Sequence, residues 1–459
     1  MKPTSFEIQS RVQDRAVLVS LVLKSDRLSD AMIDYSMNEL VSLAETAGVF
    51  VMDKLIQEKD AVDFRWFIGK GKVEELKTLL NAHEANTAIF NQELSGAQVR
   101  NLEQALDVKI IDRTQLILDI FAQRSRTREG SLQVELAQLS YLLPRLSGHG
   151  KNLSRLGGGI GTRGPGETKL ETDRRHIRDR ISELRHALEE VVRHRTLHRE
   201  RRRKTGVFQV ALAGYTNAGK STLLNRLTEA DVYAENKLFA TLDPTSRSLK
   251  LPNGQEIVLT DTVGFIQHLP HDLVAAFRAT LEEVCEADLI LHVVDSSAEM
   301  REEQMRVVEQ VLEELGAHGK EKLTVFNKID LLEPSQHDWL TTEGELIRVS
   351  AMSDSDLERL KLRIENKLMG GTVTFRIPPD KGDAIALLYR IGEVLDQQIG
   401  EDERMEFKVR VKRNEYEKVG YKLTPYLVDG PVAVRELAGL DGAADAVAEG
   451  GGDSGARPQ

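Results

Sequence analysis

The segment that most restricts how this chain can fold is residues 214–221, which fits the pattern G-x-x-x-x-G-K-[ST]. Its residues are, in order, Gly214, Tyr215, Thr216, Asn217, Ala218, Gly219, Lys220 and Ser221. It follows the apolar run 207–213, a strand candidate, and opens a helical pattern over 221–227. The glycines let backbone N–H groups curl around phosphate oxygens, and the helix N-terminus adds positive partial charge. The segment therefore predicts a phosphate-binding loop in an α/β domain with a parallel sheet.

Individual side chains of this loop have predictable roles. Lys220 should neutralise the β- and γ-phosphates, and the Ser221 hydroxyl should ligate Mg²⁺. Thr222, the next residue of the helix, is included in the predicted nucleotide site.

A second motif, Asn327-Lys328-Ile329-Asp330, closes another strand candidate and predicts which base is bound. A carboxylate at Asp330 can accept hydrogen bonds from N1–H and the 2-amino group of guanine. Adenine has neither donor, so a buried Asp330 would stay unpaired and adenine would be rejected. Asn327 is expected to bridge to the phosphate loop, and the stem of Lys328 to pack on the base. Ser350-Ala351-Met352, after the next strand candidate, is expected to offer a backbone N–H to guanine O6.

Asp261-Thr262-Val263-Gly264 ends a strand candidate between these two motifs. Asp261 is expected to hold Mg²⁺ through water. The Gly264 N–H is expected to bond the γ-phosphate, a contact that hydrolysis removes. Upstream, the segment Phe239-Ala240-Thr241-Leu242-Asp243 contains Thr241, a candidate switch threonine on Mg²⁺, with Thr245 as the competing choice. The predicted catalytic group is Lys220, Thr241 and Gly264.

The composition limits the alternatives. With 459 residues, the chain has room for about two to four domains. A hydrophobic fraction of 41% argues against a mostly disordered chain, and a net charge of −11 excludes a uniformly basic nucleic-acid coat protein. The single Cys285 excludes an internal disulfide framework and a multi-cysteine zinc site. No run reaches the about 18 apolar residues of a membrane span, and we expect a cytoplasmic protein that is a monomer when free.

Alternating strand and helix patterns divide the chain into five expected parts. These are an N-terminal α/β subdomain over 1–128, a helical hairpin arm over 129–205, a nucleotide-binding domain over 206–370, a small α+β module over 371–430 and a disordered tail over 431–459. In the first part, residues 17–23, 87–91 and 108–112 are strand candidates and residues 28–47 and 72–83 helix candidates. In the fourth, we expect strands at 372–377 and 404–413 and a helix at 383–398.

The arm is predicted from apolar spacing. Leu132, Leu136, Leu139 and Leu143 share one helical face, and Ile177, Ile181, Leu184, Leu188 and Val191 form a coiled-coil-like seam. The two helices should pair antiparallel, and a helix over 167–204 would be about 55 Å long. Between them, the glycine-rich segment 155–169 carries Arg155, Arg163 and Lys169, which suits contact with RNA phosphates. The charged second helix has two open interpretations, a solvated face of paired charges or an RNA-binding face.

Taken together, these motifs resemble those of a known family. All five guanine-nucleotide motifs occur in order, as in translation-factor-like GTPases, and residues 239–247 and 261–269 resemble the HflX family, close to the Obg group. Residues 67–73, 112–128 and 157–175 resemble the same family. The resemblance favours Thr241 over Thr245. It implies a cytoplasmic GTPase that binds the large ribosomal subunit and its rRNA through the arm, and that splits or rescues ribosomes or acts in their biogenesis.

Two details of hydrolysis follow. Many GTPases place a glutamine after D-x-x-G to orient the attacking water, but here that position is Phe265, as the family pattern also has it. We therefore predict slow intrinsic hydrolysis that the ribosome stimulates. For Asn217 two interpretations stay open: it shapes the loop, or it coordinates K⁺ beside the phosphates, as in some related GTPases.

Two other classes of function compete with the GTPase hypothesis. An ATP-using RNA remodeller of the helicase type would have to tolerate adenine, which Asp330 opposes, and would need a second motor domain, which the sequence does not indicate. A non-catalytic scaffold on RNA is the third hypothesis.

Overall fold

The computed structural model describes residues 14–146, 165–205, 207–229, 238–267, 283–317, 319–342, 344–368, 372–400, 404–411, 416 and 419–429. Two compact units make up the chain. The first comprises Met1–Leu249 and Ile257–Ser353, and the second Lys250–Glu256 and Asp354–Gln459. The boundary after Ser353 lies earlier than the predicted domain boundary at residue 370.

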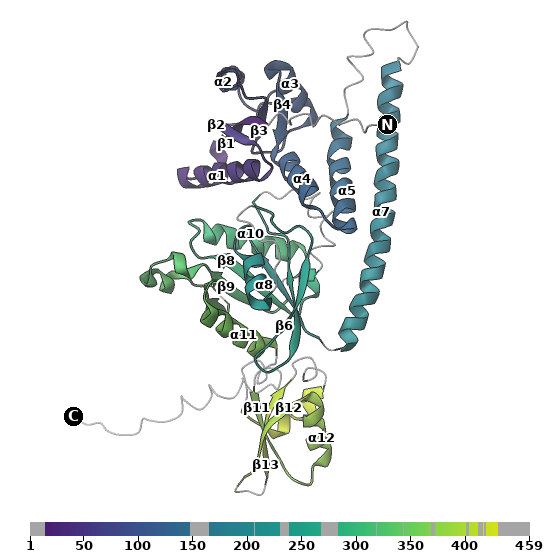
Figure 1. Cartoon of the computed structure of the whole chain (residues 1–459), viewed down its shortest axis with the longest axis vertical. Coiled ribbons are helices and arrows are strands. Elements are labelled where there is room, and N and C mark those ends of the chain that lie inside the picture. The colour runs from purple at the N-terminus through teal and green to yellow at the C-terminus, as the bar shows by residue number, and fades with distance from the viewer. Residues whose placement is uncertain are drawn as a thin grey trace, which may run out of the picture. The chain divides into compact units, whose positions relative to one another are not determined.

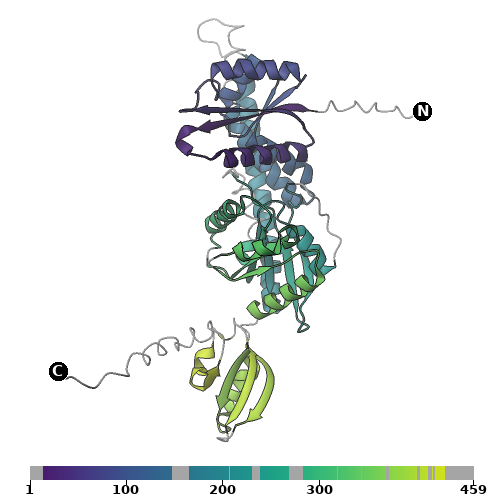
Figure 2. The ribbon, with the colours of Figure 1, turned by 90° about the vertical axis from the view of Figure 1, so that its left-hand side faces the viewer.

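The first unit begins with a four-stranded parallel sheet in the order β2-β1-β3-β4. Its elements are β1 (Arg15–Leu23), η1 (Lys24–Asp26), α1 (Asp30–Thr46), β2 (Phe50–Lys59), α2 (Lys70–Ala82), β3 (Thr87–Phe90), α3 (Gly96–Leu106), β4 (Lys109–Asp112) and α4 (Arg113–Arg124). Helices cover both faces of the sheet (Figure 2). Alternate residues of β1 point to opposite faces, so Val17 and Val19 pack with α2 and α3, whereas Ala16 and Leu18 pack with α1 and α4.

The predicted parallel α/β fold of this part is confirmed, but three of its elements were not predicted. Strand β2 and helices α3 and α4 were not among the candidates. Strand β2 is an edge strand, and most of its side chains are half-buried or exposed, so it lacks the apolar run that marks a buried strand. Helix α3 begins with a capping box in which Ser95 and Gln98 satisfy each other's backbone N–H groups.

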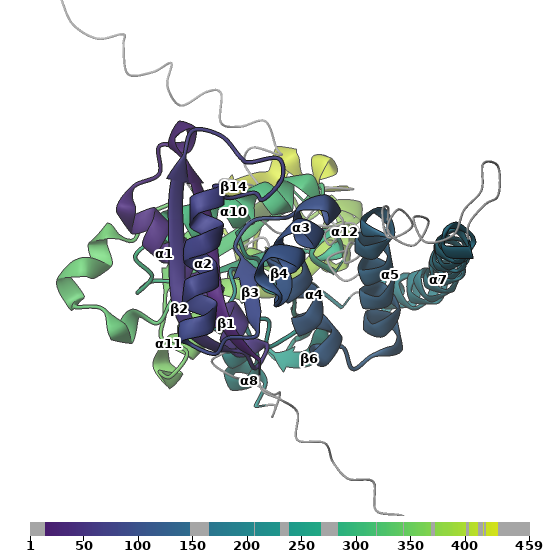
Figure 3. The same cartoon turned by 90° about the horizontal axis from the view of Figure 1, so that it is seen from above.

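Two long helices, α5 (Arg128–Arg145) and α7 (Pro165–Thr205), lie side by side as the predicted antiparallel pair (Figures 1 and 3). The predicted seam of α7 is partly or fully buried, with Ile181 and Leu184 at its centre. In α5 the four predicted leucines are half-buried. The apolar side chains that are buried in this helix are instead those of Val134, Ala137 and Tyr141. Helix α5 therefore packs against neighbours on two faces, because it lies between α4 and α7 (Figure 3).

The first unit also contains a six-stranded sheet in the order β10-β9-β8-β5-β7-β6. Strands β5, β7, β8, β9 and β10 pair parallel, as the sequence predicts for the nucleotide-binding domain. The elements are β5 (Gln209–Gly214), α8 (Lys220–Thr228), β6 (Thr245–Lys250), β7 (Glu256–Asp261), β8 (Leu289–Asp295), α10 (Arg301–Glu314), β9 (Lys322–Asn327), η3 (Ile329–Leu331), η4 (Pro334–Trp339) and β10 (Leu346–Arg348). The carboxyl ends of β5, β7 and β9 carry the three nucleotide motifs, so the topology places these motifs at one edge of the sheet.

The second unit contains a four-stranded antiparallel sheet in the order β12-β13-β11-β14. Its elements are α11 (Asp354–Leu368), β11 (Thr372–Ile377), α12 (Gly382–Ile391), β12 (Gly392–Ile399), β13 (Met405–Val411), η5 (Gly420–Lys422), η6 (Thr424–Tyr426) and β14 (Leu427–Asp429). The predicted helix over 383–398 is wrong in its second half. The chain leaves the helix at Gly392, because residues 392–399 pair with β13 as a strand.

Two predicted regions lie outside the described residues: most of the basic tip at 155–169, and the tail at 431–459. Across the helices that the structure describes, none combines the length and apolar character that crossing a membrane requires.

The core of the second unit gives a stability prediction. Phe407 of β13 is fully buried beside Phe375 and Val409, and truncation to alanine should cost about 3–5 kcal/mol through lost burial and a residual cavity. Both tryptophans, Trp66 and Trp339, lie in the first unit. In urea, Phe407→Ala should therefore shift part of the circular dichroism transition to lower denaturant while tryptophan fluorescence keeps its midpoint. An equal shift of both signals would show that the units unfold together.

Candidate functional site: a nucleotide pocket at the carboxyl edge of the six-stranded sheet

The phosphate loop joins the end of β5 to the start of α8, as its sequence predicts. The side chain of Lys220 is buried and folds back over the loop, where its Nζ donates to the carbonyls of Gly214 (3.0 Å) and Tyr215 (2.8 Å). Burial lowers the pKa of Lys220 to about 8, against the opposing charge of Asp261. The ammonium group is thus held at the position where phosphate charge would arrive.

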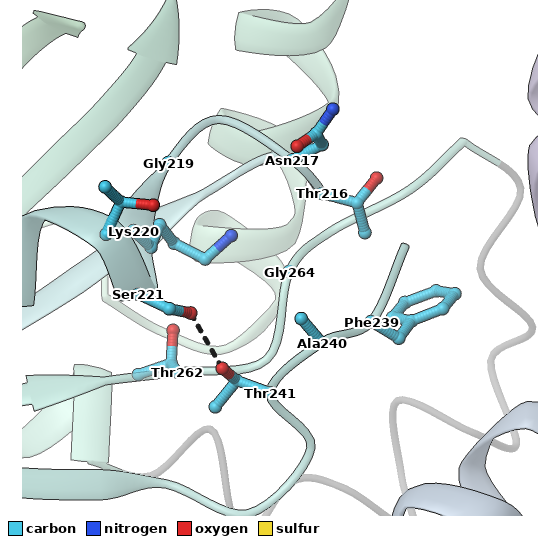
Figure 4. A pocket seen from close by; sticks show the side chains of 11 residues that line it. Thr216, Asn217, Gly219, Lys220, Ser221, Phe239, Ala240, Thr241, Thr262 and Gly264 are labelled. Carbon is cyan, nitrogen blue, oxygen red and sulfur yellow. Dashed lines mark hydrogen bonds between the residues drawn. The ribbon is translucent and has the colours of Figure 1, made fainter. Parts of the chain in front are cut away.

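Three oxygen-bearing side chains from separate segments meet beside Lys220, and Figure 4 shows two of them, Ser221 and Thr241. The Ser221 hydroxyl donates to Asp261 Oδ2 at 2.6 Å, the Thr241 hydroxyl donates to the same oxygen at 2.8 Å, and the two hydroxyl oxygens are 2.8 Å apart. These are the three residues predicted to hold the metal. They come from the start of α8, the loop before β6 and the end of β7, so only the folded sheet brings them together.

The chemistry of this cluster suits a small hard cation. Asp261 is fully buried, and its Oδ1 has no hydrogen-bond partner. Burial raises the pKa of Asp261, while Lys220 and the two hydroxyl donors oppose that rise. A buried carboxylate oxygen without a partner, next to two hydroxyl oxygens, matches the all-oxygen ligand preference of Mg²⁺. Elsewhere in the described part of the chain, no three His, Cys, Asp or Glu side chains gather as a metal site.

The structure also separates the two candidate switch threonines. Thr241 lies in the cluster, whereas Thr245 begins β6 and its hydroxyl lies 3.5 Å from the backbone oxygen of Asp243. Thr241 is thus the one of the two that lies beside Asp261, and its role on the metal stays a prediction.

Gly264 lies against the phosphate loop, and its predicted contact with the γ-phosphate stays a prediction. A Cβ at this position would be 2.9 Å from Thr216 Cα and 3.0 Å from Lys220 Nζ, so a side chain here would force the phosphate loop to shift. Thr216 has a buried hydroxyl without a hydrogen-bond partner in the same pocket. The next residue, Phe265, is fully buried and pairs through its backbone with Gly214 and Thr216. Its side chain therefore belongs to the core and has no part in orienting water.

The base-recognition motif lies at the end of β9. Asn327 makes the predicted bridge, since its Nδ2 donates to the Ala218 carbonyl at 2.9 Å. Its Oδ1 accepts from the Ala351 N–H at 3.1 Å, and the Met352 N–H donates to the Ser350 hydroxyl at 3.2 Å. The N–H groups of Ala351 and Met352, in the segment expected to reach guanine O6, are thus engaged within the protein.

Two details of this motif differ from the expectation. Asp330 is exposed in η3, so the protein alone does not bury it, and a bound base would have to cover it. Lys328 pairs with Asp295 at 2.6 Å, which fixes its stem at the end of β8. We therefore predict that Asp330 can discriminate against adenine only if the incoming base itself desolvates the carboxylate.

Four residues of the predicted nucleotide set have side chains that are engaged in contacts within the protein. The Thr262 hydroxyl donates to the Leu212 carbonyl at 2.7 Å, so it ties β7 to β5. Tyr215 and Asp243 bond to the N-terminal part of the unit, and Phe239, which lines the pocket, also packs on Phe121. Among the other predicted members at these motifs, Ala240, Leu242, Val263 and Ile329 have apolar side chains, and Ala240 and Thr222 line the pocket.

Asn217 has an exposed side chain and a left-handed backbone with φ of 61°. Asparagine tolerates this conformation better than most residues, which supports the loop-shaping interpretation. The potassium interpretation stays a prediction.

Sequence reasoning missed the residues that support the site from the N-terminal sheet. The buried carboxylate of Glu39 pairs with Arg113 and accepts from the Tyr215 hydroxyl of the phosphate loop. Arg113 also donates to the carbonyl of Gln267, just beyond Gly264, at 3.0 Å. A charged residue inside an otherwise amphipathic helix, as Glu39 is, gives no sequence signal of such a role.

The lowered pKa of Lys220 gives a pH prediction. In the empty protein the ammonium group of Lys220 loses its proton above pH about 8. Only the charged ammonium group attracts the phosphates of GTP. The Kd for GTP should be constant below that pH and rise by up to about tenfold per unit above it. Titrations with a fluorescent GTP analogue from about pH 6.5 to 8.8 would measure how the Kd depends on pH. This range lies below the pH at which guanine itself ionises. A flat profile, or an unchanged slope in Lys220→Arg, would contradict the assignment.

The geometry at Asp330 gives a specificity prediction. Asp330→Asn removes an acceptor for the 2-amino group and supplies a donor, so the variant should bind GDP at least about a hundredfold more weakly and should gain affinity for xanthosine diphosphate. Competition titrations with GDP, xanthosine diphosphate and ADP measure the change. Asp338→Asn, an exposed exchange in the nearby η4, is the matched control. A variant that still prefers guanine would contradict base recognition by this carboxylate.

Comparison with known proteins shows which protein families and solved structures the chain is similar to. Residues 34–122, 124–202 and 209–328 match family models described as GTP-binding GTPase N-terminal, GTP-binding GTPase middle region and 50S ribosome-binding GTPase. A solved GTP-binding protein from the archaeon Sulfolobus solfataricus in complex with GDP is 24% identical, with 77% of this chain and 98% of that chain covered and a TM-score of 0.41.

Curated relatives are more similar. The GTPase HflX of Caldanaerobacter subterraneus subsp. tengcongensis is 52% identical over 396 residues, which cover 85% of this chain and 90% of that protein. The GTPase HflX of Escherichia coli strain K12 is 42% identical over 421 residues, which cover 91% and 97%. The identity to these relatives over most of the chain shows that it belongs to the HflX family of GTPases.

Proposed function

We propose that this GTPase is a GTP-driven switch that binds the large ribosomal subunit and its rRNA, hydrolyses GTP slowly on its own and faster on the ribosome, and splits or rescues ribosomes or acts in their biogenesis. The observation that carries the proposal is the convergence of Ser221, Thr241 and Asp261 beside the buried Lys220. This arrangement joins a switch loop to the phosphate site, which is how a GTPase senses the γ-phosphate.

Mg²⁺ would be held by Ser221 and Thr241, with Asp261 acting through water, and when bound it would neutralise charge that develops on the phosphates. The chain's own contribution is to hold the side chain of Lys220 in a buried position and to keep Gly264 close to it. Both effects stabilise phosphate charge in a low-dielectric pocket.

The slow intrinsic rate follows from Phe265. Its side chain is fully buried, so the position that orients water in many GTPases offers no polar group here. A partner that orders the segment after Gly264, or supplies the missing group, would accelerate the reaction.

The proposed ribosomal partner is supported by the family description of residues 209–328 as a 50S ribosome-binding GTPase and by the arm. Helix α7 exposes Arg175, Arg178 and Arg185, a cationic row suited to RNA phosphates. Arg180 is instead committed to the protein, because it forms a two-pronged ion pair with Glu135 of α5. Part of the helix charge is therefore structural and part is free to face a partner.

Single-turnover GTP hydrolysis with and without purified large ribosomal subunits tests this function. We expect an acceleration of about 10³–10⁵, the range that groups supplied in trans give other GTPases. A variant without residues 157–164 should keep its GTP affinity but lose ribosome splitting and the acceleration. No stimulation of the complete chain would contradict the proposal, and splitting by the shortened chain would contradict the role of the arm.

A further inference from the structure

The loop that carries Thr241 is attached to the N-terminal helices on both sides of that residue. On one side, Phe239 is almost fully buried and packs edge-to-face on Phe121 of α4, with ring centroids 4.7 Å apart. On the other side, the carboxylate of Asp243 bonds to the segment that begins α5. Thr241, whose hydroxyl bonds Asp261, lies between these two attachments.

Asp243 makes its contacts with the N-terminal end of α5. Its Oδ2 accepts from the N–H groups of Arg126 (2.8 Å) and Thr127 (2.9 Å), and its Oδ1 accepts from the Thr127 hydroxyl. Thr127 is the N-cap of α5, and its hydroxyl oxygen accepts in turn from the Gly130 N–H at 2.9 Å. A carboxylate at this end of a helix is also favoured by the helix dipole.

Gly130 shows how close the approach is. A Cβ on Gly130 would lie 2.3 Å from Asp243 Oδ1, which is far inside van der Waals contact, so only glycine allows Asp243 to dock here. Gly130 lies in the first turn of a helix, where alanine would otherwise be the more favourable residue. The helix thus keeps an unfavourable residue at a point where the loop that carries Thr241 touches it.

We infer that Asp243 is a positioning residue: by docking on the N-terminus of α5 it holds Thr241 at the metal cluster, and so couples the nucleotide site to the first helix of the arm. This rests on the metal-binding role proposed above for Thr241. Coupling of this kind is reciprocal, so whatever loosens Thr241 also frees the start of α5, and whatever displaces α5 weakens the hold on Thr241. Asp243 itself touches no reacting atom.

Gly130→Ala tests the inference from the side of α5, because it displaces Asp243 and leaves every residue of the nucleotide pocket unchanged. Affinities for a non-hydrolysable fluorescent GTP analogue and for GDP are measured with Mg²⁺ and with EDTA, without ribosomes. The analogue-to-GDP affinity ratio in Mg²⁺ should fall about tenfold or more in Gly130→Ala and in Asp243→Ala, since charge-assisted hydrogen bonds are lost. The ratio in EDTA should not change, and the neighbouring Ser131→Ala should match the unmodified protein.

The result would differ if Asp243 only capped α5 and did not position Thr241. Gly130→Ala would then raise thermal stability through helix propensity and leave the ratio unchanged, which would overturn the inference. Thr241→Ala serves as the reference. If it lowers the ratio and Gly130→Ala does not, the metal role stands and the coupling fails; if it has no effect, the metal role fails and the inference with it. Because no ribosome is present, neither result depends on the proposed partner.

The reverse direction of the coupling has its own readout. Amide hydrogen exchange at Arg126 and Thr127 should be slower with the GTP analogue and Mg²⁺ than with GDP, and Asp243→Ala should abolish the difference. Equal exchange in both nucleotide states of the unmodified protein would also overturn the inference.

Discussion

The arrangement of the first unit depends on one buried carboxylate, that of Glu39 in α1. It pairs with Arg113 at the start of α4 and accepts from the Tyr215 hydroxyl of the phosphate loop. Removing one partner of such a buried pair costs about 3–5 kcal/mol, because the other charge stays buried without compensation. The N-terminal sheet and the nucleotide-binding sheet are therefore fixed relative to each other at the phosphate loop itself.

Further hydrogen bonds extend this pair into a network. Arg113 also donates to Asn91, at the end of β3, at 2.9 Å, and to the Gln267 carbonyl at 3.0 Å, and the Gln267 N–H donates to the Tyr215 hydroxyl at 2.8 Å. The burial of Tyr215 next to the Glu39 charge raises the pKa of its phenol, so it stays a neutral donor. The segment that follows Gly264 is thus tied to residues from three elements of the N-terminal sheet and its helices.

The two halves of the unit hold different parts of the site. The edge of the six-stranded sheet supplies the rigid parts, Lys220, Asp261 and Asn327, each at the end or start of a regular element. The N-terminal half holds the loop parts, through Phe239 and Asp243 on one side and Gln267 on the other. Loops have few contacts of their own, so their conformation depends on what packs against them.

The sequence alone predicted the motifs of the candidate nucleotide site, because each motif is contiguous and its chemistry requires particular residues at fixed spacing. Residues 214–221, 261–264 and 327–330 are of this kind, and the strands that precede them were predicted from short apolar runs. The sequence predicted secondary structure less well where the local residue pattern and the strand pairing of the folded chain disagree. The half-exposed β2 has no clear period, and residues 392–399 continue a helical pattern but pair as a strand with β13.

What the sequence determined by itself was the phosphate loop, the order of the guanine motifs and the antiparallel helices of the arm, all of which depend on residues close together in the chain. What only the tertiary structure decided was which distant side chains meet. Glu39 and Tyr215 are 176 positions apart, and Thr127 and Asp243 are 116 positions apart. No local periodicity encodes such a pair, because its free energy comes from burial and hydrogen bonding that exist only after both sheets have formed.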